Sequence, residues 1–164
     1  MPLLHNGDRF PRLSIRKVGG GTIELPGDLA GSFGVVLIYR GAWCPYCNAQ
    51  LAAFARASAK LDEAGVKVVA FSVDDETTTA ALAAKHTVRY PLGYGADADA
   101  TAAAVGAYVN PEPHYLQTTG FVLTPDGSVV NAVYSSAAIG RLVPDDVAGL
   151  VAYIKSKTAA ATAA

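Results

Sequence analysis

Residues 35–54 read VVLIYRGAWCPYCNAQLAAF, and this stretch decides the fold. It opens in a continuous apolar run, GVVLIYR at 34–40, which is typical of a strand buried on both faces. A helical pattern follows, and Pro45 suits its first position. The two cysteines of the chain, Cys44 and Cys47, stand between these patterns. The sequence therefore places a dithiol where a buried strand ends and a helix begins.

The rest of the chain alternates strand and helix patterns around this unit. After a hairpin-like or loop entry, we expect a helix from the cysteines to the glycine at 65, a strand at 66–74, a helix at 74–86, a shorter helix at 98–108, two strands around the turn 125–127, and a last helix at 143–157. This order predicts an α/β fold with a mixed central β-sheet flanked by helices. We expect one domain over 1–157 and a flexible, low-complexity tail over 158–164.

The composition is that of a globular domain without a charged surface for polyanions. Of the 164 residues, 51% are hydrophobic and 16% charged, and 13 Lys and Arg face 14 Asp and Glu. No stretch concentrates basic residues, so we expect neither a nucleic-acid nor a membrane partner. The segment MPLLHNGDRFPRL lacks an apolar core long enough for a signal peptide, so we expect a cytoplasmic protein. In that compartment a close cysteine pair is more often catalytic or metal-binding than a structural crosslink.

The position of the pair favours redox chemistry. Unpaired N–H groups and the helix dipole gather at a helix start and stabilise a thiolate. Residues three apart there have Cα atoms roughly 5 Å apart, within the range of a disulfide. Cys47 shares a helix face with Leu51, Phe54 and Leu61, so it leans toward the core. On these grounds Cys44 is expected to be the more exposed sulfur and to attack, while Cys47 resolves.

Two other interpretations of the pair stay open. Two core thiols without chemistry would show the same spacing. A metal site needs about four ligands, whereas His5, His86 and His114 are scattered along the chain. We therefore expect no metal within one chain and no cofactor, although a site shared across a dimer is conceivable.

The tetrad Cys-Pro-Tyr-Cys resembles that of many glutaredoxins in the thioredoxin superfamily. The longer frame resembles the peroxiredoxins of the AhpC/TSA family. Three stretches carry this resemblance: GDRFPRLSI, LIYRGAWCPYCNAQL and GFVLTPDGSVVNAVYSSAAIGRLVPDDVAGLVAYI. The resemblance covers about 7–154 and implies a thioredoxin-like fold with peroxiredoxin-like elaborations.

The resemblance also assigns roles, with departures. It puts the peroxidatic cysteine at Cys47, and Cys44 stands where the family keeps a threonine. Arg40 replaces the family's upstream proline, and no arginine occupies the place near Thr118 where the family has one. We expect Arg40 and Arg141 to supply the positive charge instead. The residues alone favour Cys44 as attacker and the resemblance favours Cys47, so the assignment stays open.

Further candidates flank the pair. Trp43 is a packing residue or a platform for an incoming partner, and Tyr46 is expected to be exposed as part of an apolar rim. Thr118 and Thr119 are candidate hydroxyl or N–H donors to a substrate. His114 lies in a Pro-rich loop, as a general base or an ordinary solvated histidine.

The resulting prediction is a thiol-dependent, peroxiredoxin-like enzyme that cycles through a Cys44–Cys47 disulfide and reduces peroxides. The first alternative is a thioredoxin- or glutaredoxin-like oxidoreductase acting on protein or mixed disulfides. A second alternative is a non-enzymatic redox sensor or metal-binding module. Expected partners are a peroxide or disulfide substrate and a thiol or thioredoxin-type reductant, and the resemblance implies a homodimer.

Overall fold

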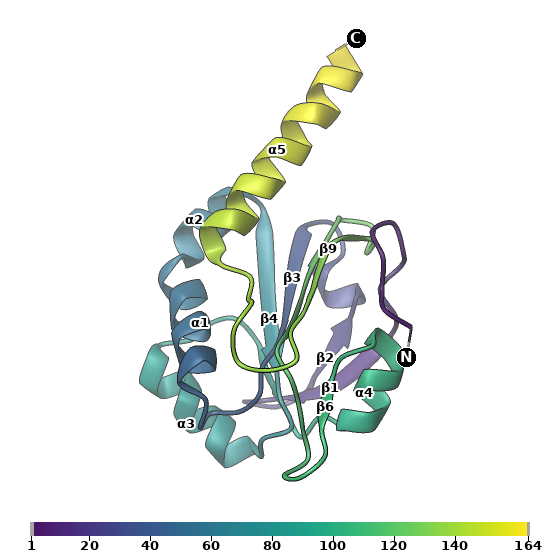
Figure 1. The fold of residues 1–164 in the computed structure, drawn as a ribbon. Helices are drawn as coiled ribbons and strands as arrows, with labels where there is room; N and C mark the ends of the chain where they lie inside the picture. The colour runs from purple at the N-terminus through teal and green to yellow at the C-terminus, as the bar shows by residue number, and fades with distance from the viewer. Residues whose placement is uncertain (1, 164) are drawn as a thin grey trace.

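The structure, a computed structural model, describes residues 2–163, and Figure 1 shows its ribbon. The elements are β1 (Leu13–Lys17), β2 (Thr22–Leu25), the 3-10 turn η1 (Gly27–Leu29), β3 (Phe33–Ile38), α1 (Pro45–Arg56), α2 (Ser58–Glu63), β4 (Val66–Phe71), α3 (Glu76–His86), β5 (Leu92–Tyr94), α4 (Ala98–Val105), β6 (Val109–Asn110), β7 (Tyr115–Leu116), β8 (Thr119–Leu123), β9 (Val129–Tyr134) and α5 (Pro144–Ala163).

A mixed seven-stranded sheet forms the centre, in the order β2-β1-β5-β4-β3-β8-β9. Strands β3, β4 and β5 pair in parallel, and β8 joins β3 antiparallel. Parallel neighbours need crossover helices, which α1, α2 and α3 provide. The predicted α/β class with a mixed sheet is confirmed.

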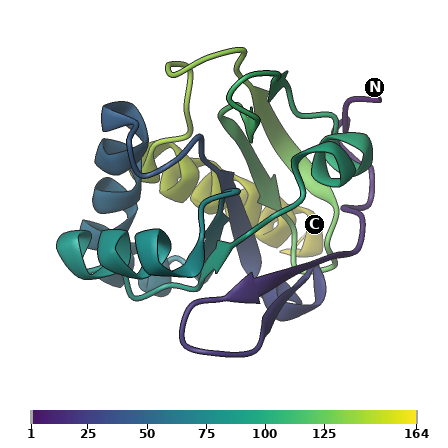
Figure 2. The ribbon, with the colours of Figure 1, turned by 90° about the horizontal axis from the view of Figure 1, so that it is seen from below.

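Both faces of the sheet are covered, as the apolar run of β3 requires. Val35 and Leu37 point into one core together with side chains from α1, α2 and α5. Val36 and Ile38 alternate to the other face, where α4 packs. Figure 2 shows the sheet between α1 and α3 on one side and α4 on the other. The central strand is therefore rigidly held, and so is the loop that leaves it.

Several boundaries differ from the sequence predictions. The helix after the cysteines is broken at Ala57, where φ −88° and ψ 7° depart from helical values. The entry segment holds two strands, β1 and β2, and the short strands β5, β6 and β7 were not predicted. Helix α5 continues to Ala163, through most of the segment expected as a tail. Helix bounds do not measure flexibility, so the tail and the domain limits stay predictions.

Helix α5 projects from the body of the domain (Figure 1). Its first turns pack on the core through Val147 and Val151. Within residues 2–163, no helix has the length and apolarity needed to cross a membrane.

Candidate active site

Cys44 caps the first turn of α1. Its backbone is extended at φ −90°, ψ 115°, and its Sγ accepts a hydrogen bond from the backbone N–H of Cys47 at 3.2 Å. This is the geometry of an N-cap residue, with sulfur in place of the usual oxygen. Both cysteines are free thiols. The prediction of a dithiol at a strand-to-helix junction is confirmed.

Neither sulfur reaches solvent. Cys44 and Cys47 each have 0% exposed surface. The burial of Cys47 follows from its helix face, which it shares with the equally buried Leu51 and Phe54. The expected exposure of Cys44 was wrong, because two arginine side chains from distant segments approach its sulfur.

Arg141 is the first of these, and it lies in the loop between β9 and α5. Its Nη2 is 3.0 Å from the Sγ of Cys47, 3.7 Å from the Sγ of Cys44 and 2.8 Å from the Oγ1 of Thr118. Its Nη1 donates to the Oε1 of Gln50 at 2.7 Å. One guanidinium therefore spans both sulfurs in a fixed orientation.

Arg40 is the second, directly after β3. Its Nη1 is 3.8 Å from the Sγ of Cys44, and its backbone N–H donates to the Sγ of Cys47 at 3.4 Å. The Oε1 of Gln117 accepts from its Nε at 2.9 Å, and the hydroxyl of Tyr115 accepts from its Nη2 at 3.1 Å. The guanidinium also lies 4.8 Å from the ring centroid of Trp43. Arg40 therefore closes the other side of the pair.

These surroundings shift the pKa values of the two thiols in opposite directions. Burial raises the pKa of Cys44, but hydrogen bonds from the Cys47 thiol and N–H, the Arg40 guanidinium and the charge of Arg141 outweigh it and hold that pKa below its ordinary value. Burial raises the pKa of Cys47, and its hydrogen bond to Cys44 raises it further. The arrangement stabilises a thiolate at Cys44 and a protonated thiol at Cys47.

A polar network fixes the loop before Cys44. The amide Nδ2 of Asn48 donates to the carbonyls of Ala42 and Cys44 at 2.8 and 2.9 Å. Its Oδ1 lies 2.9 Å from the Nε2 of His86, the last residue of α3. The carboxylate of Asp74 accepts from the N–H of Ala42 at 2.8 Å. The loop is thus held by side chains from α1, from α3 and from the segment between β4 and α3.

The other predicted residues are placed as follows. Thr118 is buried and contacts Arg141, while the buried Thr119 donates its hydroxyl to the carbonyl of Gln117 at 3.1 Å. Trp43 and Tyr46 are each 55% exposed beside the pair, as expected for Tyr46.

His114 is not part of the site. Its Nε2 lies 3.2 Å from a carboxylate oxygen of Asp99, and both side chains are exposed. Among residues 2–163, no group of three or more His, Cys, Asp or Glu side chains is arranged to hold a metal ion.

Sequence reasoning missed the partners that orient the arginines and the loop. Gln50, Tyr115, Gln117, Asn48 and His86 have no motif that marks them. Only Gln50 carried a signal, since it follows Cys47 by three residues and so lies near it on the helix.

Solved structures share this fold. The peroxidoxin BcpB of Mycobacterium tuberculosis superposes with a TM-score of 0.78 at 20% identity, covering 92% of this chain and 98% of that one. AhpC of the same organism gives 0.76 at 20% identity, covering 95% and 96%. The chain therefore has a thioredoxin-like fold of the peroxiredoxin type.

Sequence comparison then defines the family. A profile of the AhpC/TSA family matches residues 6–132, and the chain belongs to this family. A peroxiredoxin of Treponema denticola is 35% identical over 74 residues, which are 45% of this chain but only 34% of that protein. The thiol-disulfide oxidoreductase ResA of Bacillus cereus is 30% identical over 129 residues, covering 77% of this chain and 68% of that one.

Proposed function

We propose that the protein is a thiol-dependent peroxidase that cycles between the Cys44–Cys47 dithiol and its disulfide. The observation that carries the proposal is the paired environment of the sulfurs: Arg141 contacts both, while the pKa of Cys44 is lowered and that of Cys47 is raised. Membership of the AhpC/TSA family supports peroxide as the oxidant.

The reaction follows from these roles. The Cys44 thiolate attacks one peroxide oxygen, the O–O bond breaks, and the leaving alkoxide or hydroxide takes a proton. Cys44 becomes a sulfenic acid, and Cys47 condenses with it to give the disulfide and water. Two equivalents of a thiol, or one dithiol protein, then reduce the disulfide and are themselves oxidised to a disulfide.

Arg40 and Arg141 are assigned the stabilising role. A guanidinium beside each side of the pair offsets the negative charge that passes from sulfur to the leaving oxygen. Thr118 holds Arg141 in place, and Thr119 begins the adjoining strand β8, where it pairs with Ile38 of β3. Trp43 and Tyr46 form the apolar rim that a reductant protein would contact.

Single-turnover consumption of hydrogen peroxide by the reduced protein tests the proposal. We expect a rate well above that of a free thiol such as glutathione at the same pH, with one disulfide formed per peroxide. A rate equal to that of the free thiol would exclude the peroxidase function.

Thiol–disulfide exchange with protein or mixed disulfides is the second candidate. The Cys-Pro-Tyr-Cys arrangement and the 30% identity to ResA favour it. Reduction of a protein disulfide at enzymatic rates, with no reaction toward peroxide above the free-thiol rate, would select this candidate.

We also propose a cytoplasmic location and a homodimer. A reducing compartment would keep the pair as thiols and supply the thiol or thioredoxin-type reductant. Sedimentation velocity of the purified chain tests the dimer directly.

A further inference from the structure

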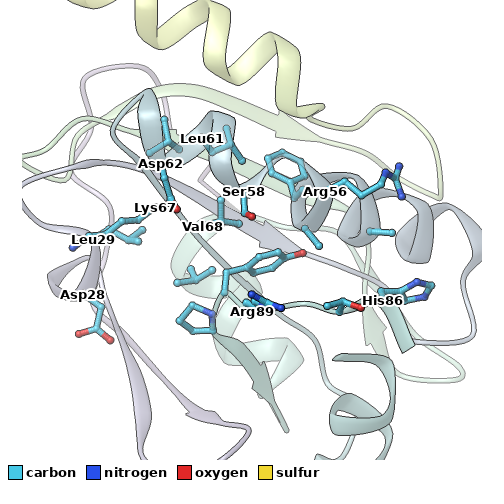
Figure 3. A pocket seen from close by; sticks show the side chains of 18 of the residues that line it. Asp28, Leu29, Arg56, Ser58, Leu61, Asp62, Lys67, Val68, His86 and Arg89 are labelled. Atoms are coloured by element: carbon cyan, nitrogen blue, oxygen red, sulfur yellow. The ribbon is translucent and has the colours of Figure 1, made fainter. Parts of the chain in front are cut away.

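Both thiols are closed off from solvent, although a peroxide must touch one of them to react. Cys44 and Cys47 each have 0% exposed surface. The hollow between α1, α2, the end of α3 and β4 (Figure 3) is not a route to them, because neither cysteine is among the described residues that line it. Arg40 and Arg141 are half-buried, and their guanidinium nitrogens lie 3.8 and 3.7 Å from the Sγ of Cys44. An oxidant therefore reaches Cys44 only when part of this cover moves.

The Arg141 side of the cover is firmly anchored. The Nε of Arg141 donates to the carbonyl of Ala138 at 2.5 Å, and its Nη1 donates to the Oε1 of Gln50 at 2.7 Å. Its Nη2 donates to the Oγ1 of Thr118 at 2.8 Å. Because each of the three nitrogens has a close partner, moving this side chain would break three hydrogen bonds at once.

The Arg40 side of the cover is held more loosely. Its Nε donates to the Oε1 of Gln117 at 2.9 Å and its Nη2 to the hydroxyl of Tyr115 at 3.1 Å, while its Nη1 makes only a long contact with the Sγ of Cys44. The remaining support comes from two rings, since the guanidinium lies 4.8 Å from the centroid of Trp43 and 5.5 Å from that of Tyr115. Contacts of this kind are weak where the ring is exposed. The cover therefore opens more readily here than on the other side.

The ring of Trp43 lies against Arg40 because residue 41 is a glycine. A Cβ at Gly41 would clash with the Nε1 of Trp43 and lie 2.7 Å from its Cδ1. Gly41 does not have a positive φ, so the close approach of the ring, and not the backbone conformation, requires glycine here. The half-exposed indole also meets Tyr115 edge-on, with the ring centroids 5.0 Å apart. Trp43 is thus seated on the backbone of Gly41 with Arg40 and Tyr115 against it.

We propose that Trp43 and Arg40 form a gate over Cys44, and that Trp43 is a specificity-determining residue that restricts the reaction to small peroxides such as hydrogen peroxide. The proposal rests on the peroxidase function and names its substrate class. Hydrogen peroxide is the smallest peroxide, so it needs the least displacement of the guanidinium. A hydroperoxide with an aryl group needs the whole stack to move aside, which costs the ring contacts and the hydrogen bonds to Gln117 and Tyr115. Trp43 acts through Arg40 and is in this respect a positioning residue.

The test compares a small and a bulky neutral thiol reagent, iodoacetamide and N-phenylmaleimide, on the reduced full chain, with adducts at Cys44 identified by mass spectrometry. Both reagents attack the thiolate, so the thiolate fraction cancels in the ratio of their rate constants. The ratio of the maleimide rate to the iodoacetamide rate is compared with the same ratio for N-acetylcysteine. We expect it to be about tenfold lower in the protein, the effect of breaking one further hydrogen bond to admit the larger reagent. Equal ratios would overturn the proposal.

Gly41→Ala displaces the ring of Trp43 without changing either side chain of the gate. We expect the reagent ratio to rise about threefold to fivefold toward that of N-acetylcysteine, the effect of losing one exposed cation–π contact. Gly149→Ala is the matched control, because Gly149 is exposed on α5 and a Cβ there meets nothing within 4 Å. No rise in Gly41→Ala, or an equal rise in Gly149→Ala, would overturn the gate.

A double variant separates the gate from a disturbed loop. Trp43→Ala should raise the reagent ratio at least as much as Gly41→Ala does. Adding Gly41→Ala to Trp43→Ala should have no further effect, because the new Cβ then has no indole to displace. Independent effects of the two substitutions would show that Gly41→Ala acts on the loop itself, and would overturn the proposal.

Peroxides extend the comparison to the proposed reaction. In single-turnover oxidation, the ratio of the cumene hydroperoxide rate to the hydrogen peroxide rate should rise about threefold to fivefold in Gly41→Ala. If neither peroxide reacts faster than with a free thiol, the peroxidase function fails, while the alkylation ratios still decide the gate. If both peroxides react rapidly and Gly41→Ala changes neither ratio, the gate fails and the peroxidase function stands.

Discussion

At the level of single residues, the two thiols differ because their surroundings differ. Cys44 receives the N–H of the first helical turn and lies near both guanidinium groups. Cys47 is closer to the Arg141 guanidinium, but it lies deeper in the helix and donates to Cys44, and these two effects raise its pKa. The threonine that the family keeps at position 44 would offer a hydroxyl. A thiol there instead adds a second sulfur, within reach of the same Arg141 guanidinium as Cys47.

The pH dependence of alkylation follows from this difference. Because the pKa of Cys44 is lowered, iodoacetamide should react with the reduced protein at a rate that rises with pH around a midpoint below that of a free thiol. Cys44→Ser removes the hydrogen bond to Cys44, but burial still raises the pKa of Cys47, so the midpoint should lie above that of the parent. A midpoint in Cys44→Ser below that of the parent would contradict the assignment.

Arg141→Lys tests the shared guanidinium. Lysine keeps the charge but cannot span both sulfurs, Gln50 and Thr118 as the planar fork does. We expect the alkylation midpoint to rise by about one pH unit and peroxide reduction to slow roughly tenfold. Arg12→Lys, at an exposed position, serves as control. An unchanged midpoint in Arg141→Lys would show that a positive charge, without the planar guanidinium, is sufficient to lower the pKa of Cys44.

Much of the site could be predicted from single residues. The residues that could not be predicted come together only in the folded chain. Cys44, Cys47 and Arg40 lie in one short stretch, so strand and helix patterns place them together. Arg141 was found through family resemblance. Tyr115 and Gln117 meet Arg40 only through the fold, and no local pattern encodes a contact across 75 or more residues.

Among the elements, the junction of β3 and α1 depends on α3. The amide Nδ2 of Asn48 donates to two loop carbonyls, so its Oδ1 is left to accept a hydrogen bond from the Nε2–H of His86. His86 is thus a positioning residue for Cys44, although it touches neither sulfur.

The variants His86→Phe and His86→Gln separate this role from packing. Phenylalanine fills space but cannot donate to Asn48, so Cys44 should be held less well and the disulfide should become harder to reduce. Loss of one hydrogen bond corresponds to a reduction potential lower by about 20 mV. Glutamine can donate and should keep the parent potential. Redox titration against glutathione measures the reduction potential of each variant. Equal potentials for the two variants would show that His86 does not position Cys44.

Long, strongly patterned elements were predicted well, and short ones were not. Strand β3, helix α1 and the β8–β9 hairpin have apolar runs or a Pro-Asp-Gly turn. Strands β5, β6 and β7 have three, two and two residues, too few for a period to be visible. They form because tertiary neighbours offer them partners.

At the scale of the whole molecule, the sheet that carries the site is packed on both faces. Phe121 on β8 is fully buried, with its ring centroid 5.2 Å from that of Phe10 and 5.7 Å from that of Tyr134. Phe121→Ala should lower the free energy of unfolding by about 3–5 kcal/mol in urea titrations. Tyr153→Ala, at a 60% exposed position, should change it little. A loss under about 1 kcal/mol for Phe121→Ala would contradict a tightly packed core.

At this scale the sequence predicted two covered sheet faces from one apolar strand, and a helix over 74–86 that ends where α3 ends. The left-handed conformation of the residue that caps it, Thr87, was not predicted, because threonine is uncommon there.

The central claim is that Cys44 is the oxidised sulfur and Cys47 its resolving partner. The direct measurement is sulfenic-acid trapping with dimedone, followed by mass spectrometry, in Cys47→Ser and Cys44→Ser after one equivalent of hydrogen peroxide. We predict that Cys47→Ser forms the adduct at Cys44 at a rate near that of peroxide consumption by the parent, and that Cys44→Ser reacts slowly. Rapid adduct formation at Cys47 in Cys44→Ser, together with little adduct at Cys44 in Cys47→Ser, would contradict the claim that Cys44 is the oxidised sulfur.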